Sequence, residues 1–168
     1  EGHIDELQAK RLNASCALDS INRLMPGRGS LLDVGCFCGV FLDMASKDGW
    51  RCCGVEPLVM PAIYARGTFG LQVITNTLKN AGLETEAFDV LTYFQVFEHL
   101  VHPNDEMSEI RRLLRVGGLI AIEVPNVDTF TVRLLGKRHR HFVQDHVNFY
   151  STATLSQFLD RHGFVVRG

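Results

Sequence analysis

One stretch of the sequence combines an acid, two glycines and apolar residues in an order that can bind a ligand. A short apolar run ends at Asp33, a turn with Gly35 and Gly39 follows, and an apolar-periodic segment then begins. This order predicts a buried strand, a tight turn and a helix start. Backbone N–H groups in such a turn can approach a ligand closely. The Asp33 carboxylate disfavours a pyrophosphate, because like charges would meet, and favours a ligand with positive charge or with hydroxyl or ammonium donors.

A second acid, Glu56, lies 23 positions after Asp33, at the end of the next expected strand. An acid about 20 residues beyond a Gly-rich turn typically binds ribose hydroxyls, so a nucleoside is expected. The G-x-G-x-x-G dinucleotide pattern is not met, since Phe37 stands where its middle glycine would be, and no P-loop sequence occurs. A ribonucleoside with ammonium and sulfonium charges fits better, which describes S-adenosylmethionine.

At these residues the chain resembles the class I S-adenosylmethionine-dependent methyltransferases of small-molecule type. Their glycine motif reads acid-x-Gly-x-Gly-x-Gly, and residues 33–39 here read DVGCFCG. Five further segments resemble the family in order: GVEP at 54–57, FDV at 88–90, FEHL at 97–100, LRVGGL at 114–119 and EVPN at 123–126. The resemblance covers about residues 30 to 126. We predict that the Phe37 ring points away from the cofactor and that the backbone alone makes the turn.

The resemblance implies methyl transfer from S-adenosylmethionine, with S-adenosylhomocysteine as the product. It also implies a set of cofactor-binding residues. The methionine portion would be bound, partly through backbone, by Asp33, Gly35, Cys36 and Gly39. The ribose hydroxyls would be bound by Glu56, and the adenine would lie near Pro57, Thr77 and Leu78. The sulfonium would lie near Phe94 and Gln95.

Candidate groups for the acceptor side lie in a basic and aromatic insertion, residues 126–150. Methyl transfer is a direct displacement at carbon, so the enzyme must align the acceptor and, for a hydroxyl or carbon acid, remove a proton. Residues 145–151, DHVNFYS, resemble the segment before the last helix in small-molecule methyltransferases, including those for sugars. His146 is the preferred base because imidazole titrates near neutral pH. Asp145 would assist it and Tyr150 would line the acceptor pocket; the alternative is that His146 only caps or packs the loop.

Other histidines leave alternatives open. His139 and His141 are further candidate bases, within the basic run of residues 136–141. Such a run is usually a solvated loop. The more specific alternative is that it binds an acceptor that carries a phosphate group. His99 follows the fourth expected strand, where a structural hydrogen bond is favoured over contact with the acceptor.

The elements that must position these residues alternate between strands and helices. Strands are expected at 31–34, 51–57, 71–74, 88–94 and 119–124, with a sixth beginning at 164–166. Helices are expected at 4–25, 40–48 and 58–65, around 107–114 with a stop at Gly117 and Gly118, and after a Ser151 cap as far as Gly163. The segment 76–87 is expected to be a loop with room for one helical turn.

This alternation predicts an α/β fold, a Rossmann-like doubly wound and mostly parallel sheet with helices on both faces. One methyltransferase-like domain, 1–168, would comprise an N-terminal helix (1–27), a cofactor-binding core (30–125) and the insertion (126–150). Ligands bind such sheets at the carboxyl ends of the strands, where the strand order reverses. The family's sheet normally has a sixth and a seventh strand, so we expect the C-terminal strands to be truncated here.

Composition places the chain among ordinary globular proteins. The 168 residues are 46% hydrophobic and 21% charged, and the net charge of −2 provides no global field for nucleic acid or an anionic membrane. No transmembrane span or signal peptide is expected, and the odd count of five cysteines favours reduced thiols and a cytoplasmic location. The cysteine spacing is not that of a zinc knuckle, so no metal site is expected.

Two functions from different classes fit these patterns. The first is a methyltransferase that acts on a small molecule, such as a sugar or another secondary metabolite. The second is a non-catalytic module that keeps the fold and binds the nucleoside in a partner or regulatory role. The replacement of the middle glycine by Phe37 and the expected truncation of the C-terminal strands motivate the second.

Overall fold

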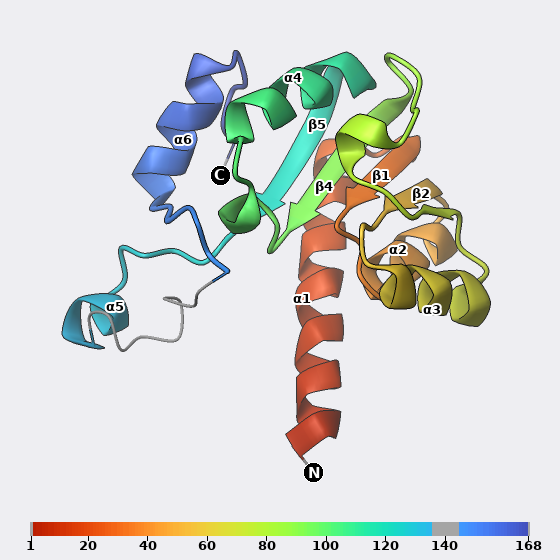
Figure 1. Cartoon of the computed structure of the whole chain (residues 1–168), viewed down its shortest axis with the longest axis horizontal. Helices are drawn as coiled ribbons and strands as arrows, with labels where there is room; N and C mark the ends of the chain where they lie inside the picture. The colour runs from red at the N-terminus through yellow and green to blue at the C-terminus, as the bar shows by residue number, and fades with distance from the viewer. Residues whose placement is uncertain (1, 136–144, 168) are drawn as a thin grey trace.

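The computed structural model describes residues 2–135 and 145–167. Its sheet has five parallel strands in the order β3-β2-β1-β4-β5 (Figure 1). The strands are β1 (Ser30–Val34), β2 (Arg51–Val55), β3 (Val73–Ile74), β4 (Phe88–Phe94) and β5 (Leu114–Glu123). The predicted Rossmann-like α/β fold is confirmed. The strand order reverses between β1 and β4, so their carboxyl ends flank the expected ligand crevice.

Helices cover both faces of this sheet. They are α1 (Gly2–Leu24), α2 (Val40–Lys47), α3 (Val59–Phe69), α4 (Pro103–Leu113), α5 (Phe130–Leu135) and α6 (Thr152–Arg161), with the 3₁₀ turns η1 (Leu78–Asn80) and η2 (Phe97–His99). Neighbouring residues of a strand point to opposite faces. Leu31 therefore packs with residues of α1, α2 and α3, whereas Leu32 packs with residues of α4, α6 and η1.

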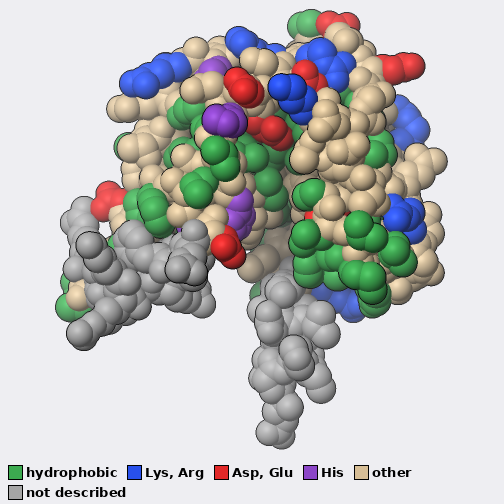
Figure 2. All heavy atoms as spheres, in the orientation of Figure 1, with side chains coloured by type: hydrophobic (Ala, Val, Ile, Leu, Met, Phe, Trp, Pro, Cys, Tyr) green, Lys and Arg blue, Asp and Glu red, His purple; other side chains and the backbone are tan. Residues whose placement is uncertain are grey.

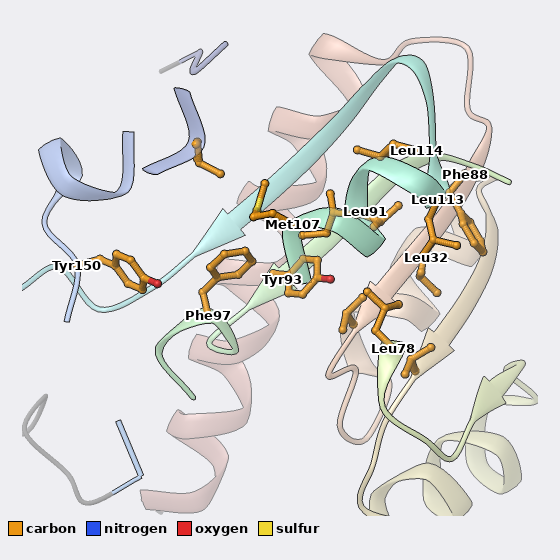
Figure 3. Packing of buried hydrophobic residues seen from close by; sticks show 14 residues of the cluster. Leu32, Leu78, Phe88, Leu91, Tyr93, Phe97, Met107, Leu113, Leu114 and Tyr150 are labelled. Atoms are coloured by element: carbon orange, nitrogen blue, oxygen red, sulfur yellow. The ribbon is translucent and has the colours of Figure 1, made fainter. Parts of the chain in front are cut away.

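The cluster on the α4 face brings together residues from distant parts of the sequence (Figure 3). Met107 and Leu113 of α4 are fully buried against the sheet. Tyr93 of β4 and Phe97 of η2 meet edge to face, with ring centroids 5.0 Å apart. Tyr150 joins the same row of rings, 6.5 Å from Phe97. The segment before α6 is thereby attached to the end of β4.

The structure corrects the expected boundary between α4 and β5. The glycine pair does not stop the helix: α4 ends at Leu113, and β5 begins at once with Leu114. Gly117, with φ of 79°, and Gly118 lie inside the strand, where the pairing with β4 shifts register between Phe88 and Val90. A Cβ at Gly118 would lie 2.9 Å from a backbone oxygen, so these glycines accommodate an irregular strand.

The expected sixth strand is wrong, since residues 164–167 form no strand. The N–H of Phe164 donates to the carbonyl of Leu159, so it completes the end of α6 instead of joining a ladder. Val165 is 81% exposed. An apolar run becomes a strand only when another strand supplies its hydrogen bonds, which sequence pattern alone does not show.

Other predicted elements are confirmed with small changes in their bounds. The strand at residues 88–94 and the Ser151 cap match the prediction, whereas β3 is shorter and α3 runs on to Phe69. Gly70, with φ of 67°, caps α3 in a left-handed conformation. Among the helices of the described residues, none is both long enough and apolar enough to span a membrane.

Candidate functional site

The turn after β1 is built from left-handed backbone. Gly35 has φ of 71° and Gly39 has φ of 77°, values that only glycine adopts without cost. The N–H of Gly35 donates to the carbonyl of Val55 at 2.7 Å, which ties the turn to β2. A Cβ at Gly35 would lie 2.5 Å from Cγ2 of Val96, so no larger residue fits there without a shift. The turn is thus packed against the segment that follows β4.

Phe37, at the position of the family's middle glycine, adopts a left-handed conformation. Its φ is 46°, a region that costs a non-glycine residue about 1–3 kcal/mol and that clusters at functional sites. Its ring is 54% exposed, and its N–H donates to Oε2 of Glu56 at 2.8 Å. The backbone therefore makes the turn without its middle glycine, whereas the direction of the ring relative to a bound cofactor stays a prediction.

Glu56 joins the two turns that flank the crevice. Its side chain is 4% exposed, and its two carboxylate oxygens accept hydrogen bonds from the N–H groups of Phe37 and Leu58, each at 2.8 Å. Carboxylate oxygens have about four acceptor sites in total, so these bonds leave capacity for ribose hydroxyls. Ribose binding by Glu56 stays a prediction.

Asp33 is a buried carboxyl group at the end of β1. It is 4% exposed and accepts a hydrogen bond from Oγ1 of Thr92 at 2.6 Å. Burial raises the pKa of Asp33 from 3.8 to about 7; the Thr92 hydrogen bond opposes this rise, and the charge of Glu56 adds to it. A cationic group placed beside Asp33 would favour its ionised form, so the site suits an ammonium group.

The other predicted cofactor residues differ in how far they are buried. The side chains of Cys36 and Leu78 are buried in the two hydrophobic clusters, so only their backbone can meet a ligand. Pro57 and Thr77 are exposed at the ends of β2 and β3. Phe94 is partly buried and meets Phe41 edge to face, with ring centroids 4.7 Å apart.

Gln95 is a second non-glycine residue in left-handed conformation at the carboxyl edge of the sheet. Its φ is 58° and its side chain is exposed. Its N–H donates to the carbonyl of Glu123 at 2.8 Å, and its side-chain amide donates to the Glu123 carboxylate at 3.0 Å. These bonds hold the strained residue in place where the resemblance puts the sulfonium.

The acceptor-side segment, residues 145–150, is attached directly to η2. The N–H groups of Val147 and Asn148 both donate to the carbonyl of Glu98, at 2.9 and 3.0 Å. The Asn148 side chain also donates to the carbonyl of Leu100. Nδ1 of His99 bonds the carbonyl of Asp145 at 2.7 Å. His99 thus makes a structural hydrogen bond to the same segment that carries His146.

The predicted catalytic residues have different surroundings. The His146 ring lies edge to face with His99, with centroids 4.9 Å apart, whereas Asp145 is exposed. Tyr150 is only 8% exposed, and burial, with a smaller contribution from the charge of Glu98, raises the pKa of its hydroxyl. His139 and His141, like the rest of residues 136–144, lie outside the described residues.

Sequence reasoning missed Glu98 as a site residue. Its side chain is 1% exposed, and neither carboxylate oxygen accepts a hydrogen bond from the described part of the chain. Burial raises the pKa of Glu98; its own backbone N–H and then the rings of His99 and His146 oppose this rise, and the charge of Glu123 adds to it. The signal in the sequence was an acid next to a histidine just after a strand, but nothing there shows that the acid is buried.

Next to the crevice, the surface carries a hydrophobic patch on α3 (Figure 2). Its members are all about half exposed or more: Leu58, Val59, Met60, Ile63 and Tyr64. Figure 2 also shows histidine side chains at the surface of the half of the molecule that carries α4 and α6.

Comparison with curated proteins identifies methyltransferases. A ubiquinone biosynthesis O-methyltransferase of Aliivibrio fischeri is 25% identical, and the match covers 100% of this chain and 77% of that protein. A tRNA U34 carboxymethyltransferase of Methylococcus capsulatus is 28% identical over 80% of this chain and 44% of that protein.

Solved structures of methyltransferases share the fold. One from Thermotoga maritima has a TM-score of 0.72 at 23% identity, covering 97% of this chain and 78% of its own. One from Archaeoglobus fulgidus has a TM-score of 0.71 at 22% identity, covering 90% and 69%. The family described as "Methyltransferase domain" matches residues 8–167. The chain therefore belongs to this family and is a class I S-adenosylmethionine-dependent methyltransferase.

Proposed function

We propose that this methyltransferase moves the methyl group of S-adenosylmethionine to a small-molecule acceptor at the carboxyl edge of β1, β2 and β4. The observation that carries the proposal is the pair of buried carboxyl groups, Asp33 and Glu56, on the two sides of the left-handed turn. Their chemistry matches an ammonium group and a ribose diol. The five cysteines form no disulfide, which supports a reducing, cytoplasmic location as part of the proposal.

The proposal gives each part of the site a task. Asp33 binds the ammonium group of the methionine portion, and Glu56 binds the ribose hydroxyls. The adenine lies near Pro57, Thr77 and the backbone of Leu78. The backbone at Gly35, Cys36 and Gly39 shapes the pocket, and Phe94 and Gln95 border the sulfonium.

The acceptor occupies the space between Gln95 and the segment 145–150. His146 takes the acceptor proton, Asp145 assists, and Tyr150 borders the pocket from its buried position. A small molecule is favoured over RNA because the net charge of −2 provides no field for a polyanion. Of the two curated relatives described above, the one named for ubiquinone biosynthesis matches the whole chain, which also favours a small acceptor such as a sugar or another secondary metabolite.

Thermal unfolding with S-adenosylhomocysteine, NADH and ATP tests the cofactor assignment. A ligand that binds only the native state raises the melting temperature, by an amount equivalent to about 2.7 kcal/mol at 100 times its Kd. We expect a rise with S-adenosylhomocysteine and none with NADH. A rise with NADH alone would contradict the proposal.

A metabolite screen with S-adenosylmethionine, read by mass spectrometry as a gain of one methyl group, tests the acceptor. We expect a methylated product that His146→Ala reduces while the S-adenosylhomocysteine shift is kept. Cofactor binding without any product across the screen would favour the non-catalytic alternative.

A further inference from the structure

Glu98, His99 and His146 form a cluster that the cofactor does not explain. One ligand atom from each, a carboxylate oxygen or a ring nitrogen, lies within 4.8 Å of the others. We propose that these three residues bind a divalent transition-metal ion of the zinc type. Two imidazoles and one carboxylate are a known three-residue zinc set, which leaves a position open for another ligand.

The state of Glu98 is the independent observation that points to a ligand. A carboxylate that is 1% exposed and accepts no hydrogen bond from any other described residue is costly to keep in the folded protein. A bound cation would compensate both oxygens. Protonation of Glu98 is the competing explanation, because burial also raises its pKa.

The hydrogen bond of His99 orients this ring as a metal ligand. A carbonyl oxygen only accepts, so Nδ1 carries the hydrogen that bonds Asp145 at 2.7 Å. The neutral ring then has its lone pair on Nε2. Metal-binding histidines commonly donate their second N–H to a carbonyl or a carboxylate, which fixes the tautomer.

The backbone holds the third ligand close to the other two. Val147 and Asn148 both donate to the carbonyl of Glu98, so the chain on the C-terminal side of His146 is bound to η2. Ligand atoms around a tetrahedral ion with bonds of about 2.1 Å stand about 3.4 Å apart. Small side-chain rotations would therefore close the cluster around an ion.

A metal ion at this cluster would also narrow the class of acceptor, and this step rests on the proposed methyl transfer. Glu98 and His99 follow Gln95 by three and four positions, and His146 belongs to the acceptor-side segment, so the open metal position would border the acceptor space. A metal-bound hydroxyl would lose its proton to solvent water at a lower pH than a free one, and its oxygen would then take the methyl group as S-adenosylhomocysteine leaves. The acceptor class would then be an alcohol, phenol or enol, bound through the oxygen that is methylated. His146 would be a ligand in that case, and the metal would replace it as the group that promotes ionisation.

Titration of the chelator-treated protein with Zn²⁺ alone, by calorimetry, tests the site without cofactor or acceptor. We expect about one ion per chain, and affinity weaker by more than about 100-fold in Glu98→Gln and in His146→Ala. Loss of an outer partner alone costs about 10- to 100-fold. His102→Gln, which changes an exposed histidine outside the cluster, should bind as the parent does.

Co²⁺ absorption separates this cluster from the cysteines. Ligation by nitrogen and oxygen gives visible bands without the strong near-ultraviolet band of a thiolate ligand. No binding by the parent protein, a thiolate band, or equal affinity in parent, Glu98→Gln and His146→Ala would each overturn the inference. The S-adenosylhomocysteine shift, measured on the same variants, shows that they are folded and reports separately on the cofactor site.

Discussion

At the scale of single residues, Asp33 gives the folded protein a specific pH dependence. The folded state keeps the Asp33 proton up to about pH 7, whereas the unfolded state loses it near 3.8. Between these values the native state binds more protons, so this group lowers the free energy of unfolding as pH rises. A shift of about three units corresponds to at most about 4 kcal/mol.

Asp33→Asn should remove this pH dependence. The free energy of unfolding of the variant minus that of the parent should grow from pH 4 to pH 7 and stay constant above. Urea unfolding of both proteins at several pH values measures this difference, in which the other titrating groups cancel. Parallel pH profiles would show that Asp33 has an ordinary pKa in the folded protein.

Phe37 and Gly35 provide a matched pair of substitutions in one turn. Phe37→Gly relieves a left-handed conformation worth about 1–2 kcal/mol but adds about 0.5–1 kcal/mol of unfolded-state entropy. We expect the stability to rise slightly, by at most about 1.5 kcal/mol. Gly35→Ala should instead lose about 2–4 kcal/mol, because the new Cβ meets Val96 and φ is 71°. Equal losses in both variants would contradict the backbone assignment.

At the scale of elements, the start of α6 was predictable because its signal is local. Oγ of Ser151 accepts from the N–H of Thr154 at 3.1 Å, and Oγ1 of Thr154 accepts from the N–H of Ser151 at 2.8 Å. Loss of such a cap costs about 1 kcal/mol. Ser151→Ala should therefore destabilise the protein by about that amount, whereas Ser151→Asp should retain most of the stability. Urea midpoints compare them, and an unchanged midpoint in Ser151→Ala would contradict the cap.

Elements that depend on distant partners were harder to predict. The strand at residues 88–94 was found because both of its faces are apolar, as in a central parallel strand. The glycine pair at 117–118 was misread, because its role depends on a register shift opposite β4. The apolar run at 164–166 was misread for the same reason, since strand formation requires a neighbour.

The same distinction applies to the site. Asp33 and Glu56 were found from their spacing to a glycine turn, which is a local pattern. Glu98 is contacted by Val147, Asn148 and His146, which lie far along the chain, so its sequence neighbours do not reveal its surroundings. The buried state of Glu98 therefore became visible only in the fold, whereas the roles of Asp33 and Glu56 stay predictions.

At the scale of the whole molecule, the site is assembled at one edge of one sheet (Figure 1). The turn after β1 supplies the buried acid, the turn after β2 supplies the second acid, and the end of β4 meets the segment before α6. No single stretch contains all of these groups. The sheet order, with β1 between β2 and β4, is what brings them together.

That central position of β1 also has a consequence for synthesis on the ribosome. Leu31 of β1 pairs with Val90 of β4, 59 positions later in the chain. At about 5–20 residues per second, the ribosome needs roughly 3–12 s to make that interval. During this time one side of β1 has no strand to pair with, and its apolar side chains depend on chaperones or on the helices already made. Slowing translation between these two strands should therefore increase aggregation of the nascent chain more than slowing it after β4.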